Sequence, residues 1–177
     1  MKRYLTKQMA VEALKRMQSF HDAVVHAYST FGMDLLDDLG RRNIVMSKAQ
    51  EKFFSQVLSE AYSGVEPDGK TGQPDIVIGE LGVELECKLT SRHKSGSITL
   101  QTDFETLERK GSLDYLYVIA GPEFKDFCVL HFEGLTVDDF RSLSPGARGK
   151  VAMYKWKAMS KCNVLVGNVR NISDERV

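Results

Sequence analysis

Cysteine is scarce in this 177-residue chain, and its distribution excludes a cysteine-based metal site. Cys87, Cys128 and Cys162 are far apart and belong to no CxxC or Cys/His ligand pattern. We therefore expect them to be small, buried hydrophobic residues in a protein of the reducing cytoplasm. No Ser/His/Asp or Cys/His arrangement stands out, so the sequence gives no support for hydrolysis by a side-chain nucleophile.

Long hydrophobic runs are absent as well. No apolar segment approaches the roughly 20 residues that span a bilayer, and the polar start of the chain, MKRYLTKQ, leads into a predicted helix and not into a signal peptide. The sequence contains no internal repeat and no low-complexity segment. We expect a cytoplasmic protein that has no membrane partner.

Net charge is also absent, because 24 basic side chains balance 24 acidic ones. The charges are unevenly distributed, however: residues 63–145 carry eight basic and fifteen acidic side chains, whereas residues 146–177 carry seven and two. An acidic middle suits a divalent cation and a basic end suits phosphate. Unequal charge along a chain is also common in proteins that bind neither.

A β-hairpin is predicted over residues 76–89, where a short apolar run, a turn between two glycines and a strictly alternating strand follow one another. The alternation directs Val83, Leu85, Cys87 and Leu89 toward a core. The opposite face of the same strand then carries Glu84, Glu86 and Lys88.

Asp75 directly precedes this hairpin and brings a further carboxylate to the charged face. Carboxylates held this close are costly to keep ionised without a cation. The spacing therefore indicates a metal site. The alternative interpretation is an ordinary amphipathic edge strand whose charged face is solvated.

Pro74-Asp75, the hairpin and Glu86-x-Lys88 together resemble the signature of the PD-(D/E)xK nuclease superfamily. Within it, the chain is most similar to type II restriction endonucleases, with the surrounding context running from residue 47 to residue 120. The resemblance and the chain length imply a single α/β domain with a central mixed β-sheet flanked by helices, a restriction-endonuclease-like core. We divide the domain into an N-terminal helical part (1–46), a catalytic core (47–132) and a basic C-terminal part (133–177).

The resemblance implies a Mg²⁺-dependent endonuclease that hydrolyses phosphodiester bonds of double-stranded DNA at specific sequences, with Mn²⁺ able to substitute for Mg²⁺. It further implies a homodimer, since two-fold symmetry matches palindromic sites, and a companion DNA methyltransferase that protects host DNA. Two alternatives stay open. One is a structure-selective nuclease, such as a junction resolvase or a repair nickase, and the other is a non-catalytic DNA-binding module on the same fold.

Each motif residue has an expected role in this chemistry. Asp75, Glu86 and the main-chain carbonyl of Cys87 offer hard oxygen ligands suited to Mg²⁺, which lowers the pKa of a bound water and polarises the scissile phosphate. Lys88 lies on the same face as Glu86 and is expected to orient that water or to neutralise the transition state.

Glu51 is the candidate for one more catalytic residue, because many members of the resembled family supply an acidic residue from a helix before the Pro-Asp pair. We predict that helix over residues 48–63, opened by a capping box of Ser47 and Gln50. Glu51 lies about 70° from the centre of its apolar stripe and Glu60 about 110°. An equal alternative is a first-turn glutamate favoured by the helix dipole.

Basic side chains expected to contact DNA come from two regions. The first is a turn directly after the catalytic strand, with Arg92 and Lys94. In the second, lysines alternate with Tyr154 and Trp156, which is typical of surfaces that touch a DNA backbone; the alternative is an amphipathic element with buried aromatics and solvated lysines. The candidates in that region are Arg148, Lys150, Lys155, Lys157 and Lys161.

Several further elements frame the site. We predict a helix from a Thr6 cap through Tyr28, a shorter helix that ends at Gly40, a loop over 66–73, a helix over 102–110, and strands over 115–120, 127–132 and, as an edge, 164–166. The letters of residues 64–71 match a P-loop, but Pro67 lies within them and a strand follows, so we reject that interpretation.

Overall fold

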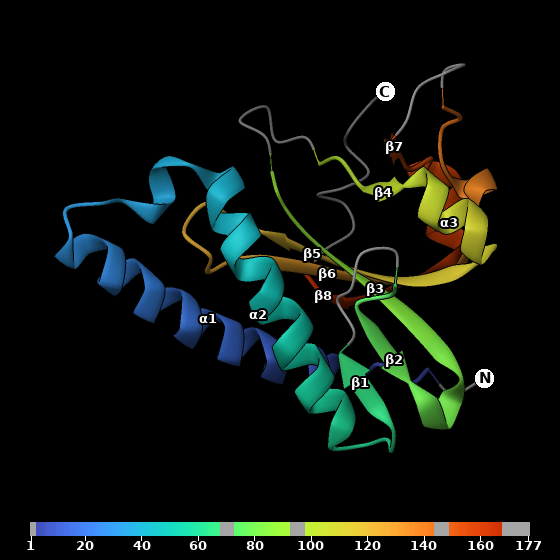
Figure 1. Ribbon diagram of the computed structural model, residues 1–177, viewed down its shortest axis with the longest axis horizontal. Helices are drawn as coiled ribbons and strands as arrows, with labels where there is room; N and C mark the ends of the chain where they lie inside the picture. Colours follow the sequence, from blue (N-terminus) through green and yellow to red (C-terminus); the bar gives the residue numbers. More distant parts are fainter. Residues whose placement is uncertain (1–2, 68–72, 93–97, 144–148, 168–177) are drawn as a thin grey trace.

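The computed structural model describes residues 3–67, 73–92, 98–143 and 149–167. A six-stranded sheet with the strand order β1-β2-β3-β5-β6-β8 forms the centre of one α/β domain (Figure 1). Strand β3 runs parallel to β5, and every other neighbouring pair in this sheet is antiparallel. The strands are β1 (Val65–Pro67), β2 (Ile76–Ile78), β3 (Val83–Ser91), β5 (Leu113–Ala120), β6 (Phe127–Leu135) and β8 (Cys162–Val166).

Two hydrophobic cores lie on the two faces of this sheet. Helices α1 (Lys7–Thr30) and α2 (Leu39–Ser59) pack over one face, where Phe54, Leu85 and Leu116 are buried together. A smaller layer covers the other face over Tyr115 and Tyr117. That layer holds β4 (Gln101–Asp103), α3 (Phe104–Lys110), β7 (Lys150–Ala152) and α4 (Lys155–Ala158), and β4 and β7 form a separate two-stranded sheet (Figure 1). The predicted mixed sheet flanked by helices is therefore confirmed.

The predicted hairpin and its alternation are confirmed. Strand β2 pairs antiparallel with β3 across a 3₁₀ turn, η2 (Gly79–Leu81), and Gly82 closes that turn at a φ of 62°, which favours glycine. Leu85 and Cys87 are buried on the helical side. Glu86 and Lys88 are half-buried on the opposite side, beside Tyr115 and Tyr117 of β5.

The predicted start of the second long helix is wrong. Helix α2 begins at Leu39, after a 3₁₀ turn η1 (Leu35–Asp37), so Gly40 lies in its first turn and ends no helix. Asp38 caps it, since its Oδ1 accepts a hydrogen bond from the Arg41 amide at 3.1 Å. Ser47 is an interior residue whose hydroxyl donates to the Ile44 carbonyl. The proposed boundary between the N-terminal helical part and the catalytic core, at residue 46, also falls within α2.

Other boundaries differ by smaller amounts. Part of the predicted 66–73 loop belongs to β1, and the predicted 102–110 helix is the strand β4 followed by α3. Residues 155–161 are helical, as α4 and a 3₁₀ turn η4 (Met159–Lys161), and another 3₁₀ turn, η3 (Val137–Asp139), follows β6. The Thr6 cap of α1 is confirmed by the Met9 amide at 3.2 Å from its hydroxyl, and β8 is the predicted edge strand.

Among the described residues, no helix is both long enough and apolar enough to cross a membrane.

The position of the α2 cap leads to a test of the fold. We expect Asp38→Ala to lower the free energy of unfolding by about 1 kcal/mol, because the first-turn amides of α2 lose their acceptor. Ser47→Ala is the matched control. Alanine is favoured inside helices, so this change is expected to leave stability within about 0.5 kcal/mol of wild type. Urea unfolding followed by circular dichroism measures both; a larger loss for Ser47→Ala would contradict the observed helix start.

Candidate active site

The edge of β3 provides the first part of the site. Strand β2 pairs with β3 only as far as Leu85, so β3 continues past the point where β2 begins. Asp75 directly precedes β2, and its Oδ2 accepts a hydrogen bond from the Cys87 amide at 2.7 Å. The N–H and C=O of one strand residue point to the same edge. The Cys87 carbonyl therefore shares this edge with the Asp75 carboxylate.

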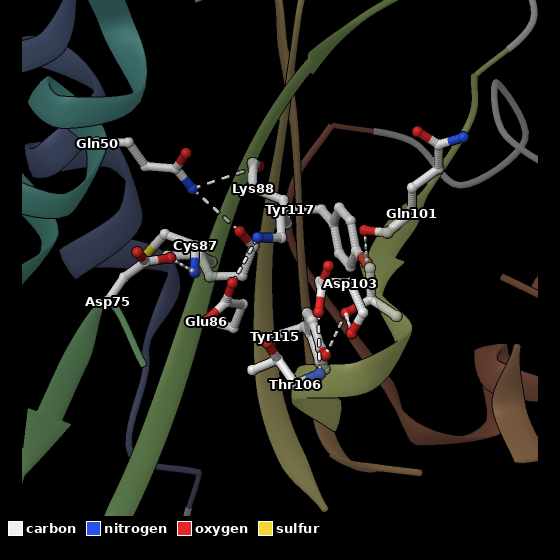
Figure 2. Close-up of polar contacts among 12 residues, drawn as sticks. Gln50, Asp75, Glu86, Cys87, Lys88, Gln101, Asp103, Thr106, Tyr115 and Tyr117 are labelled. Carbon is white, nitrogen blue, oxygen red and sulfur yellow. Dashed lines mark hydrogen bonds and ion pairs between the residues drawn. The ribbon is translucent and has the colours of Figure 1, made fainter. Parts of the chain in front are cut away.

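Glu86 and Lys88 provide the second part, from the sheet face that carries β4 and α3. Their side chains form an ion pair, and they are 13% and 31% exposed. Oε1 of Glu86 accepts from the Lys88 ammonium, whereas Oε2 is buried and has no hydrogen-bond partner among the described residues. Figure 2 shows Asp75, Glu86 and Lys88 gathered around one short stretch of β3.

The protonation of Asp75 reflects this crowding. Burial raises the pKa of the Asp75 carboxyl to about 6, and the nearby Glu86 and Glu51 carboxylates act in the same direction, against the Cys87 amide and Lys88. Burial lowers the pKa of Lys88, but the charges of Glu86 and Asp75 and the hydrogen bond to Glu86 act against burial, and the net pKa is raised. Lys88 is therefore a cation near neutral pH, beside an Asp75 carboxyl whose ionisation is disfavoured by its burial and by the neighbouring glutamates.

Helix α2 contributes Lys48, Gln50 and Glu51 to the site. Glu51 is 14% exposed and forms an ion pair with Lys48 at 2.6 Å, and its charge reaches Asp75. Gln50 is fully buried, and its amide nitrogen donates to the Leu116 carbonyl at 3.0 Å and lies 3.5 Å from the Lys88 carbonyl (Figure 2). The helix is thereby fixed to β5 and placed over β3 at the level of the site.

The donor set fits Mg²⁺ in its chemistry. In the described ranges, no group of three or more His, Cys, Asp or Glu side chains is placed to hold a metal ion. Mg²⁺, however, is usually held by one or two carboxylates, with several waters and substrate phosphates filling its other positions. Asp75, Glu86 and the Cys87 carbonyl supply such oxygens, and the buried Oε2 of Glu86 lacks a partner. These three residues would hold the ion.

The basic residues predicted to contact DNA are only partly brought to the site. Lys94 and Arg148 lie outside the described residues, and Arg92 follows the end of β3. Lys150 is exposed at the start of β7. The other three ammonium groups donate to main-chain carbonyls: Lys155 to Ile98, Lys157 to Asp138, and Lys161 to Gly134.

Two features of the site were missed in the sequence. Gln50 lies four residues from both Met46 and Phe54, within an apolar stripe of the helix. A polar residue at such a position is the signal that could have identified it. Lys48 is three residues before Glu51 on the same helix flank, a spacing at which side chains meet. Glu84, the next residue along the charged face of β3, pairs with Lys110 of α3 at 2.9 Å and so stands apart from the Asp75 cluster.

A scan against protein-family models finds no match to this chain, and a search of the curated proteins finds none either. The class of protein is therefore inferred from the geometry and chemistry of its own residues.

The raised pKa of Asp75 gives a second prediction. Since the folded pKa lies above the unfolded one, the folded state binds more protons between about pH 4 and 6, and wild-type stability falls as pH rises through that window. Asp75→Asn keeps an oxygen for the Cys87 amide but cannot ionise. We expect this variant to gain stability relative to wild type, on the order of 1–2 kcal/mol, when the pH is raised from 4.5 to 7.5. Urea unfolding in EDTA measures it; an equal difference at both pH values would contradict the shift.

Proposed function

We propose that this protein is a Mg²⁺-dependent endodeoxyribonuclease that hydrolyses phosphodiester bonds of double-stranded DNA on a restriction-endonuclease-like core. The observation that carries the proposal is the convergence of Asp75, Glu86 and Lys88 from two neighbouring strands. The half-buried Asp75 carboxyl has its pKa raised by desolvation and by Glu86, and Lys88 forms an ion pair with Glu86. Two mutually repelling carboxylates beside an ammonium suit a divalent cation together with an anionic substrate.

The residues have distinct tasks in this reaction. Asp75, Glu86 and the Cys87 carbonyl bind the cation, which when bound supplies an acidified water and polarises the phosphate. Lys88 directs its ammonium toward the reacting phosphate, where negative charge accumulates in the transition state. Its pairing with Glu86 holds it in place before the substrate arrives. Glu51 adds negative charge at the α2 side of the site and is the candidate for a further ligand or water-positioning group.

The proposed biological setting is restriction. The enzyme would act as a homodimer, so that two sites cut the two strands of a palindrome, in a system with a companion DNA methyltransferase. The alternative classes are a structure-selective nuclease and a DNA-binding module without catalysis. Purified protein incubated with Mg²⁺ and plasmid DNA separates them: discrete fragments identify a restriction enzyme, cleavage of branched or mismatched DNA alone identifies the structure-selective class, and binding without cleavage identifies the module.

The third prediction concerns the carboxylates. We expect Asp75→Ala and Glu86→Ala each to abolish Mg²⁺-dependent cleavage, because each removes a ligand oxygen that no neighbouring residue replaces. Glu84→Ala is the matched control: it removes a glutamate two residues away on the same strand face, one paired with Lys110. It should cleave like wild type. The measurement is plasmid nicking and linearisation with circular dichroism to verify folding; near-wild-type cleavage by Asp75→Ala would reject the ligand assignment.

The fourth prediction concerns Lys88. Loss of a group that stabilises transition-state charge typically lowers the rate by about 10²–10³, and we expect that loss for Lys88→Ala under single-turnover conditions. DNA affinity measured with Ca²⁺ in place of Mg²⁺ should stay within a few fold of wild type. Lys110→Ala serves as the comparison, since it removes an equally paired lysine from the adjacent helix. Equal rates for the two variants would leave Lys88 as a surface residue without a catalytic task.

A further inference from the structure

Helix α2 carries a row of basic residues on its outer side. Arg41, Lys48 and Lys52 lie within about 40° of one another on the helix, at 100° per residue, and all three are exposed. The buried side chains of Met46, Gln50 and Val57 occupy the opposite side. No acidic residue falls within this narrow row, which we call the α2 ridge, between residues 41 and 59.

One residue of the α2 ridge, Lys48, lies near the candidate active site. Lys48 is 68% exposed, and its ammonium is held at 2.6 Å from Glu51, close enough to Asp75 for the two charges to interact. Near the start of α2, Arg42 and Asn43 contact the Ser91 hydroxyl at the end of β3. The helix thus runs along the strand that carries Glu86 and Lys88, and Lys48 is the ridge residue whose charge reaches Asp75.

The charges of the ridge remain available to a ligand. Lys52 makes no ion pair with any residue in the described part of the chain. Lys48 has three N–H donors, and its pairing with Glu51 uses one of them. Arg41 is offset by Asp38 at 3.3 Å and contributes less. By contrast, the ammonium groups of Lys155, Lys157 and Lys161 already donate to main-chain carbonyls of the smaller layer.

We propose that Lys48 and Lys52 bind the phosphate backbone of duplex DNA and guide one strand into the active site. This inference rests on the proposed nuclease function and assigns it a binding surface on α2, apart from the basic C-terminal part. The spacing suits the ligand: the two Cα atoms are about 6 Å apart along the helix, which corresponds to about two phosphates at 3.4 Å of axis each. Ammonium groups in such positions bind any sequence and fix the register of the duplex.

The test is the salt dependence of DNA binding. Lys48→Gln/Lys52→Gln is titrated with a duplex in Ca²⁺ over 50–200 mM salt, and each lost phosphate contact lowers the log–log slope by about 0.9. For the double variant we expect the magnitude of this slope to be smaller by about 1.8. Raising the salt from 50 to 200 mM should therefore weaken its binding by a factor about ten times smaller than the factor for wild type. Lys52→Gln alone should lose about 0.9, which separates its effect from the Lys48–Glu51 pair.

Lys7→Gln/Lys15→Gln is the matched control, because it removes two exposed lysines from α1 and changes the net charge equally. Its slope should equal that of wild type. An unchanged slope for the α2 double variant would overturn the inference, as would a slope lowered only by Lys155→Gln/Lys157→Gln. Wild-type cleavage of plasmid in Mg²⁺ is measured in parallel. If wild type binds and cuts DNA while the α2 variant keeps its slope, the inference alone fails; if wild type does neither, the proposed function fails with it.

Discussion

The hydrogen bond from the Cys87 amide to the Asp75 carboxylate is the constraint on which the site depends. It forms where β3 continues beyond the first residue of β2, so a side chain takes the place of a missing strand neighbour. Because Asp75 satisfies a main-chain donor, its carboxylate cannot turn to solvent without leaving that donor unpaired. The bond therefore holds Asp75 next to Glu86, and the proximity and burial together raise the pKa of Asp75.

Lysine side chains balance part of the negative charge that Asp75, Glu86 and Glu51 bring together. Each flanking glutamate has its own lysine: Glu86 pairs with Lys88 and Glu51 pairs with Lys48. Among the described residues Asp75 forms no ion pair and accepts a hydrogen bond from the Cys87 amide, and burial together with the charge of Glu86 raises its pKa. A divalent cation placed between Asp75 and Glu86 would relieve the same repulsion more completely than the lysines do.

The sequence was sufficient where local pattern and tertiary structure agree. The two-residue alternation of β3 predicted which side chains share a face. Thr6 was recognisable as a cap because its hydroxyl accepts a hydrogen bond from the amide of Met9, only three residues later.

The prediction from sequence failed at α2, where Ser47 and Gln50 have the letters of a capping box. Gln50 is instead buried against Leu116, 66 residues away, and Asp38 is the residue that accepts from a first-turn amide, that of Arg41. The lysines of α4 posed the same difficulty, since the Lys155 acceptor is Ile98, 57 residues earlier. Contacts at such separations leave no local pattern.

Gln50 also has a mechanical consequence. Its buried amide joins α2 to β5 and lies against the Lys88 carbonyl of β3, so one side chain fastens the helix to both central parallel strands. These contacts preorganise the helix relative to the strand that carries Lys88. Preorganisation of this kind lowers the ordering cost that accompanies the arrival of a ligand.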